Sequence, residues 1–298
     1  MKIAIRAEQG ALVNRDELEC TRGEIAFARR SPDEEAPSVI APGYESYPMV
    51  LHDVTIRNAR AIAHELSIDR EGFELVRHAT ACADIRDPCV MADRYMQEMV
   101  PFIQEHFGAS WVVPRKSSTY MRRAAGTGIP KAGWNAVTGV REPAGLAHVD
   151  YAPVTAPMVA AAENQLLGIP IKPYSRLMVI QAWRALSEPP QDFPLAFCDA
   201  STLTGSDIAV VDYVGDVRRL ERKEPGAATK SSNAMFGADQ RWYYFPDLRS
   251  DELILFKGYD SEEHYKVQSA HSAFDNRRTF PDAMPRESVE ARFFVYFN

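Results

Sequence analysis

The sequence predicts a mainly β protein with flanking helices, an α+β arrangement around an antiparallel sandwich or jelly-roll barrel. Two observations support this prediction. Short runs rich in β-branched and aromatic residues fill the second half of the chain, and turn residues rather than helices separate them. No Gly-rich nucleotide-binding motif accompanies them. We expect one domain for residues 1–298, with residues 1 to about 110 as an N-terminal addition of strands and a helix, because β-barrel enzymes reach ~250 residues as one unit.

The first half predicts strands and loops up to residue 60 and then a long helix. Asp87 is expected as the N-cap of that helix, Pro88 as its first residue and Gly108 as its end. Pro101 lies inside it and predicts a kink or a break. A second helix is expected at 155–167, because Pro157 suits a first turn and Gly168 follows as a stop signal.

The expected strands of the second half are 177–186, 194–200, 207–213, 241–245, 252–257 and 288–297. The stretch 223–237 is rich in Gly, Ser, Ala and Lys, and its composition predicts a mobile surface loop.

Composition limits the classes of partner. A net charge of −7 and the absence of a basic run argue against nucleic acid. No apolar segment predicts a signal peptide or a membrane span, so a cytoplasmic protein is expected. The four cysteines form no C-x-x-C pair, and we expect them to be reduced and mostly buried.

One histidine stands out because a carboxylate follows two positions later. His148 and Asp150 lie in the segment GLAHVDY. In an extended segment, residues i and i+2 point the same way, so this pair would direct an imidazole and a carboxylate into one cavity. A third ligand from a distant strand would complete the facial triad of two histidines and one carboxylate that is typical of non-heme iron(II) oxygenases.

Late in the chain, His264 and His271 are the candidates for the third ligand. We predict His271, because it borders the apolar segment SAHSAF, whereas His264 lies in the charged run DSEEHYK. Further along, Arg286 and Ser288 would share one face of an extended segment. An arginine fork suits the distal carboxylate of a dicarboxylate such as 2-oxoglutarate, and a neighbouring hydroxyl adds a donor.

With these residues in place, the chain resembles the CmcJ/AsaB-type hydroxylases and desaturases of secondary metabolism. The resemblance covers most of the chain, and it rests on the segments 68–80, 147–153, 181–186, 194–200, 241–261, 271–276 and 286–292. It implies a double-stranded β-helix of the jelly-roll or cupin type, Fe(II), 2-oxoglutarate and O2, with ascorbate as an aid in vitro. It also implies that His148, Asp150 and His271 are both catalytic residues and metal ligands.

Further site residues carry over from the same resemblance. Arg286 and Ser288 are expected to bind 2-oxoglutarate, and Arg122 in the predicted strand STYMRRAAG is a further candidate for contact with 2-oxoglutarate or with the substrate. Arg184, in the pair Trp183-Arg184, is a candidate for a substrate carboxylate, although a structural ion pair explains it equally well. Tyr151 is a candidate substrate contact. The sequence departs from the family pattern at AWRALSEPPQ, where a proline is expected sooner.

The predicted activity is oxidation of an unactivated C–H bond of a small biosynthetic molecule, by hydroxylation, desaturation or oxidative cyclisation. An amino acid or another carboxylic acid is the expected substrate class, and monomer and homodimer both stay open. Three alternatives remain: an iron oxidase independent of 2-oxoglutarate, a zinc hydrolase, and a non-catalytic β-barrel binding protein. The zinc hydrolase lacks a recognisable base motif such as H-E-x-x-H.

Overall fold

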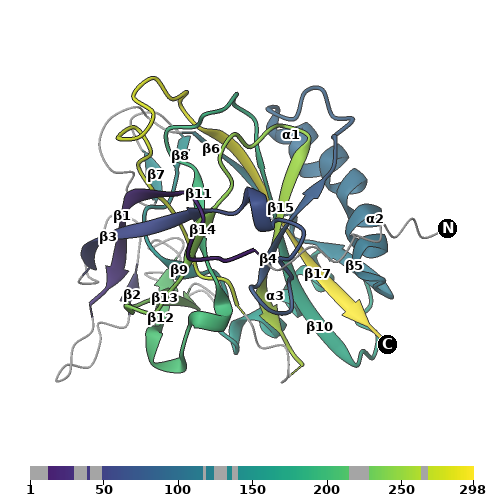
Figure 1. Cartoon of the computed structure of the whole chain (residues 1–298). Coiled ribbons are helices and arrows are strands. Elements are labelled where there is room, and N and C mark those ends of the chain that lie inside the picture. Colours follow the sequence, from purple (N-terminus) through teal and green to yellow (C-terminus); the bar gives the residue numbers. More distant parts are fainter. Residues whose placement is uncertain are drawn as a thin grey trace.

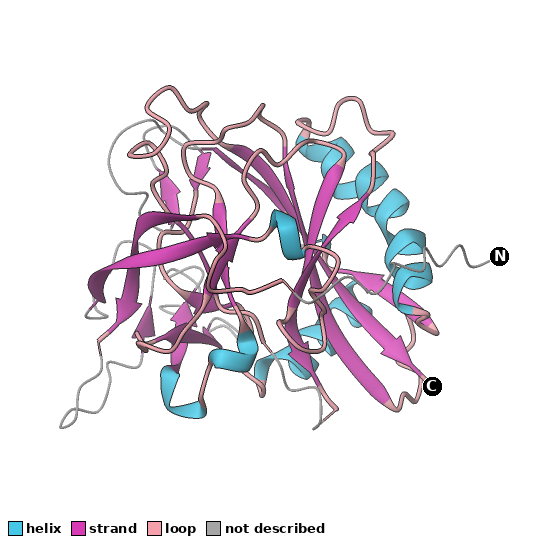
Figure 2. Cartoon of the chain, viewed as in Figure 1, coloured by secondary structure: helices cyan, strands magenta, loops and turns pink. Residues whose placement is uncertain are grey.

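Two β-sheets form the body of the structure, and their inner faces meet (Figures 1 and 2). The computed structural model describes residues 13–29, 39–40, 49–116, 119–123, 133–135, 140–214, 228–262 and 268–298. The 9-stranded sheet has the order β1 (Cys20–Ala28), β3 (Met49–Asn58), β14 (Trp242–Tyr244), β11 (Leu195–Cys198), β16 (His271–Ala273), β9 (His148–Val149), β13 (Ala228–Ala234), β12 (Ile208–Val214) and β2 (Val39–Ile40).

The second sheet carries the longest buried strands. Its order is β4 (Phe73–Arg77), β15 (Glu252–Asp260), β10 (Arg176–Ala185), β17 (Glu287–Phe297), β6 (Tyr120–Arg123), β8 (Val140–Glu142) and β7 (Gly133–Asn135), and β5 (Trp111–Pro114) also pairs with β17. Strand β10 pairs antiparallel with both β15 and β17. Both edges of β10 are therefore hydrogen-bonded to neighbouring strands, and the strand is buried along nearly its whole length.

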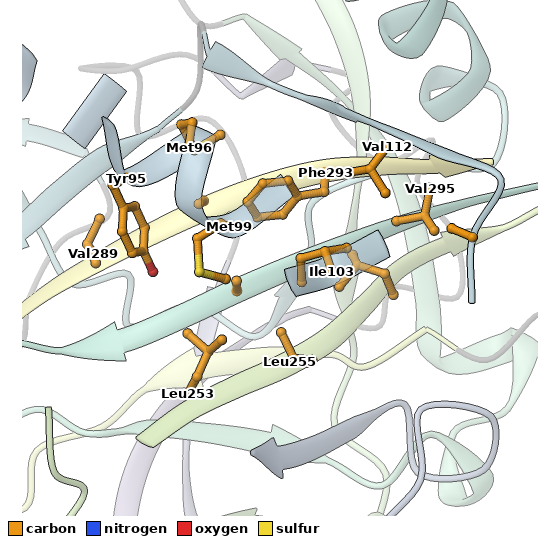
Figure 3. Packing of buried hydrophobic residues seen from close by; sticks show 14 of the residues in the cluster. Tyr95, Met96, Met99, Ile103, Val112, Leu253, Leu255, Val289, Phe293 and Val295 are labelled. Carbon is orange, nitrogen blue, oxygen red and sulfur yellow. The ribbon is translucent and has the colours of Figure 1, made fainter. Parts of the chain in front are cut away.

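Alternation along β10 and β17 assigns each side chain to one of two faces. Trp183 and Phe256 pack against Phe197 and Tyr243 of the opposite sheet, so this face lies inside the barrel. The other face packs against α2 (Met96–Phe107), where Met99 and the remaining apolar side chains of the cluster meet the sheet (Figure 3). Burial of apolar surface on both sides stabilises this sheet.

The helices begin and end largely where the sequence predicts. Asp87 caps α1 (Pro88–Val90) by accepting from the backbone of Cys89, and Gly108 ends α2 in the left-handed conformation with φ 61°. A π-helical turn, Met91–Tyr95, joins the two. Of the kink or break predicted at Pro101, the break is wrong, because α2 continues through this residue, and the irregular turn lies upstream. Helix α3 (Thr155–Leu166) is confirmed.

The predicted strands and the mainly β fold class are confirmed. Two expectations are wrong. Within the predicted loop 223–237, residues 228–234 form strand β13, which is hydrogen-bonded to β12 and β9; residues 223–227 lie outside the described part. Of the cysteines, Cys198 alone is buried, whereas Cys20 and Cys89 are exposed. No helix in the described ranges is both long and apolar enough to cross a bilayer.

Candidate metal centre

His148 and His271 are direct partners across two neighbouring strands. Each begins its strand, and the register pairs the two residues between β9 and β16. Paired residues project from the same face of a sheet, so the two rings lie together with centroids 4.4 Å apart. Asp150 follows His148 by two positions, and its Oδ1 lies 3.4 Å from His148 Nε2. The ligand atoms of all three residues lie within 4.8 Å of one another.

Backbone carbonyls fix the orientation of both rings. The Nδ1 of His148 lies 2.7 Å from the carbonyl oxygen of Leu146, and the Nδ1 of His271 lies 3.1 Å from that of Ser269. With Nδ1–H as the donor in both bonds, each Nε2 keeps its lone pair for a metal. Burial and the neighbouring charge of His148 lower the pKa of His271 to about 4, which favours the neutral, ligating form.

The second oxygen of Asp150 is held from the opposite sheet. Gln181 Nε2 donates to Oδ2 at 2.5 Å, and Arg292 donates to it from Nε at 3.0 Å and from Nη2 at 2.5 Å. Burial alone would raise the pKa of Asp150, but the charge of Arg292 and the hydrogen bond of His148 outweigh it, so this pKa lies well below its usual range. Asp150 therefore stays ionised with Oδ1 available to a metal.

Gly258 and Glu290 complete the support of Asp150. Glu290 Oε1 lies 2.6 Å from Arg292 Nη2 and 3.3 Å from Gln181 Nε2, so it fixes both donors. A Cβ at Gly258 would lie 2.5 Å from Gln181 Oε1 and 3.1 Å from Cδ2 of Tyr151. Only glycine leaves room for Gln181 at this position. The sequence analysis did not predict these residues as supports of Asp150, although Gln181 and Arg292 do lie on predicted strands.

A cationic pocket lies on the inner face of β17. Arg286 is 1% exposed; its Nε donates to Ser288 Oγ at 3.0 Å and its Nη1 to the carbonyl of Phe193 at 2.9 Å, and its guanidinium stacks over Trp183. Among the described residues no carboxylate lies within ion-pair distance of this guanidinium. Burial, followed by the charge of Arg122, lowers the pKa of Arg286 to about 9.

These features fit a carboxylate ligand. Arg122 pairs with Ser288 across β6 and β17, and its Nη1 donates to the carbonyl of Glu142, so a second guanidinium lies near Arg286 on this side of the sheet. The indole Nε1 of Trp183 is buried with no partner among the described residues. Bringing like charges together and leaving a donor unpaired both cost free energy, which an anion in the pocket would recover. The donor set around Asp150 fits Fe(II) for a similar reason: two imidazole nitrogens and one carboxylate oxygen leave coordination positions open.

Arg184 does not reach this site, and the substrate role predicted for it is corrected. Gln181 and Trp183 project into the barrel, so Arg184 projects to the outer face of β10. There its Nη1 donates to the carbonyls of His78 and Ser250, and Nη2 donates to His78 Nδ1 at 2.7 Å. The alternative interpretation was a structural ion pair with a carboxylate. In the structure, Arg184 instead contacts two backbone carbonyls and the His78 ring.

Tyr151 and His264 complete the predicted set. Tyr151 is 1% exposed, and its hydroxyl accepts from Arg115 Nη1 at 2.6 Å in an apolar cluster beneath Asp150. That hydroxyl is thus already bonded within the protein. His264 lies outside the described residues.

Comparison with known proteins identifies relatives of this chain. The chain is 29% identical over 253 residues to the Fe(II)/2-oxoglutarate-dependent dioxygenase nvfI of Aspergillus novofumigatus, covering 82% of this chain and 83% of the relative. It is 28% identical over 266 residues to the hydroxylase/desaturase efuI of Hormonema carpetanum, covering 85% of each. Over a shorter region, 41% of this chain and 56% of the relative, it is 33% identical to the hydroxylase/desaturase asaB of Aspergillus flavus, which confirms the resemblance found in the sequence.

A solved structure of the iron and alpha-ketoglutarate-dependent endoperoxidase NvfI superposes with a TM-score of 0.75 at 26% identity, over 93% of this chain and 97% of that one. A family model described as an oxidoreductase/YMDC permease-like domain matches residues 25–296, nearly the whole chain. The chain therefore belongs to the oxidoreductase/YMDC permease-like family.

Proposed function

We propose that this protein is an Fe(II)- and 2-oxoglutarate-dependent dioxygenase that oxidises a C–H bond of a small biosynthetic molecule. One observation supports this most strongly: His148, Asp150 and His271 converge in the same barrel interior that holds the cationic pocket of Arg286 and Ser288. A metal triad with a separate carboxylate site is the arrangement that an oxo-acid cosubstrate requires.

The side chains of the protein orient the iron and 2-oxoglutarate and supply the charges that bind them. His148, Asp150 and His271 would hold iron, while Arg292 and Gln181 keep Asp150 in place from behind. Arg286, Ser288 and Arg122 would hold the distal carboxylate of 2-oxoglutarate. When bound, iron and 2-oxoglutarate supply the oxidant, and O2 is consumed as the oxo-acid is converted to succinate and CO2. Phe197 and Phe256 pack against His271 and would help to keep water from the reacting bond.

The competing functions are less well supported. An oxidase that does not use 2-oxoglutarate would not need the cationic pocket of Arg286 beside the metal triad. Relatives such as nvfI and phiK are named as 2-oxoglutarate- or alpha-ketoglutarate-dependent. A carboxylic-acid substrate is also less favoured than the sequence suggested, because Arg184 lies on the outer face of β10. Hydroxylation, desaturation and cyclisation all stay within the proposal, as does a cytoplasmic location.

The test is the conversion of 2-oxoglutarate without a prime substrate. Purified protein reconstituted with Fe(II) under argon should develop a weak visible charge-transfer band on addition of 2-oxoglutarate. On exposure to O2 it should then release succinate slowly. The His271→Ala variant is the matched control and should do neither. A wild-type protein that binds Fe(II) but shows no band and forms no succinate would refute the proposal.

A further inference from the structure

Asn233 lies in the metal centre, although it is not among the predicted site residues. It lies on β13 and pairs directly with His148 on β9, which pairs in turn with His271 on β16. His271 pairs with Phe197 on β11. Directly paired residues project from the same face, so Asn233 extends the row of the two histidines inside the barrel.

The amide nitrogen of Asn233 has no partner within the part of the chain that the structure describes. The residue is 1% exposed, and its Nδ2 makes no hydrogen bond there. A buried amide without a partner is costly, so a donor retained in this position indicates a ligand that accepts from it. Beyond Asn233 the row continues to Ala209, whose side chain is a single methyl group.

The position of Arg286 indicates which part of a ligand reaches Asn233. The Arg286 guanidinium bonds to the carbonyl of Phe193, and its backbone N–H to Asp192, so this end of the site lies beside the start of β11. In the sheet order β11, β16, β9, β13, the two histidine strands separate β11 from β13. A dicarboxylate whose distal end binds Arg286 therefore extends its opposite end across the histidines toward β13.

We propose that the Asn233 amide donates a hydrogen bond to the C1 carboxylate of 2-oxoglutarate, the end remote from Arg286. The proposal rests on the proposed function and adds a residue that recognises the oxo-acid end of the cosubstrate. Arg286 and Asn233 then bind the two carboxylates separately, and a ligand that lacks the C1 carboxylate cannot make the contact with Asn233 but keeps the contact with Arg286.

Succinate provides the probe for this distinction. It retains the carboxylate that Arg286 would bind but has one carbon fewer, so it lacks the group assigned to Asn233. The experiment uses full-length protein loaded with Fe(II) under argon. The dissociation constant of 2-oxoglutarate is followed by the charge-transfer band, and that of succinate by displacement of 2-oxoglutarate.

Asn233→Leu and Asn233→Ala should each raise the dissociation constant of 2-oxoglutarate about tenfold to a hundredfold, as expected for loss of one hydrogen bond to a charged acceptor. The band maximum should also shift, because the electron density of the bound oxo-acid changes. Succinate binding and iron content should stay within about twofold of wild type. Thermal stability should be retained, since the amide nitrogen that is removed has no partner among the described residues.

Ser232→Ala is the matched control. Ser232 is the preceding residue of β13; it is fully buried, its Oγ is also without a partner, and it pairs with Val149 on the outer face of the sheet. This variant should bind both ligands as wild type does.

Unchanged 2-oxoglutarate affinity in both Asn233 variants would overturn the inference, and so would an equal loss of 2-oxoglutarate and succinate affinity. A loss of iron would also overturn it, since Asn233 would then act on the metal. Absence of the charge-transfer band in the wild-type protein would instead refute the proposed function, so the two failures are distinguishable.

Discussion

Arg292 on β17 donates two hydrogen bonds to the same oxygen of Asp150, from Nε at 3.0 Å and from Nη2 at 2.5 Å. Both bonds go to Oδ2, and His148 Nε2 faces the other oxygen, Oδ1. One carboxylate is thus shared between an internal cation and the metal position. The two sheets of the barrel meet at this residue, so the packing of β17 determines how Asp150 is presented.

Replacing Arg292, which holds Asp150 in place, should weaken metal binding. Arg292→Lys keeps the charge but offers one well-directed donor in place of two, and we expect iron affinity to fall by about tenfold to a hundredfold, the usual effect of removing an outer-shell partner. Iron titration of the apo-protein measures this. Arg60→Lys is the control, because Arg60 binds both oxygens of Glu252 elsewhere in the fold. It should lower the melting temperature and leave iron affinity unchanged. Equal iron affinity in Arg292→Lys and wild type would contradict the role assigned to Arg292.

Each ligand of the triad should be indispensable. His148→Ala, Asp150→Ala and His271→Ala should abolish turnover and strongly reduce bound iron, measured by elemental analysis after reconstitution. Circular dichroism should remain that of wild type, since these side chains face the barrel interior. His264→Ala should retain iron and activity. Retention of iron by His271→Ala together with its loss in His264→Ala would show that the third ligand has been misassigned.

Arg286→Lys should weaken 2-oxoglutarate binding while leaving iron affinity unchanged. Lysine cannot reproduce the fork that bonds to Ser288 and Phe193 and still reach a carboxylate. A loss of ~1.5 to 3 kcal/mol corresponds to roughly a tenfold to hundredfold rise in the dissociation constant. Ser288→Ala should cost less, because a neutral donor contributes less.

Arg184→Lys serves as the control for Arg286. It should reduce stability and leave 2-oxoglutarate binding intact, because Arg184 binds the carbonyls of His78 and Ser250. If the oxo-acid affinity changes only in Arg184→Lys, then Arg184 is the anchor and the assignment of Arg286 is wrong.

Gly258→Ala should disturb the metal centre through Gln181. The added methyl would lie 2.5 Å from Gln181 Oε1, so the amide that donates to Asp150 must move. We expect a loss of ~1 to 3 kcal/mol in the free energy of unfolding, as in other overpacked cores, with weaker iron binding. Gly205→Ala is the matched control, since a Cβ there meets nothing within 4 Å. Denaturant titration and iron titration of both variants check this, and wild-type iron affinity in Gly258→Ala would argue against it.

His78 should make stability depend on pH. Burial, followed by the charge of Arg184, lowers the pKa of His78, while Glu98 acts weakly in the opposite direction. The unfolded chain therefore binds the proton more readily, and the free energy of unfolding should fall as pH drops from ~6.5 toward the lower folded value. His271 titrates in the same direction. Urea denaturation of wild type and His78→Gln between about pH 7.5 and 5 isolates the share of His78. Parallel curves would show that His78 contributes nothing.

The sequence alone determined the strands β10, β15 and β17 of the barrel and the pairing of His148 with Asp150. Runs rich in β-branched and aromatic residues specify the strands that became β10, β15 and β17, because a strand buried on both faces needs a nearly continuous apolar run. The spacing of His148 and Asp150 is also a local property, since residues two apart on an extended segment share a face.

Tertiary structure decided which residues meet across the barrel. Arg184 and Arg286 both look like anion-binding residues in the sequence, yet register and alternation turn Arg184 outward and Arg286 inward. The segment around Asn233 has the composition of a loop, and it became a strand because β12 and β9 offer hydrogen-bonding partners on both sides. Local sequence does not encode pairing between distant strands, so the support of Asp150 by Arg292 and the place of Asn233 beside His148 emerge only when the sheets assemble.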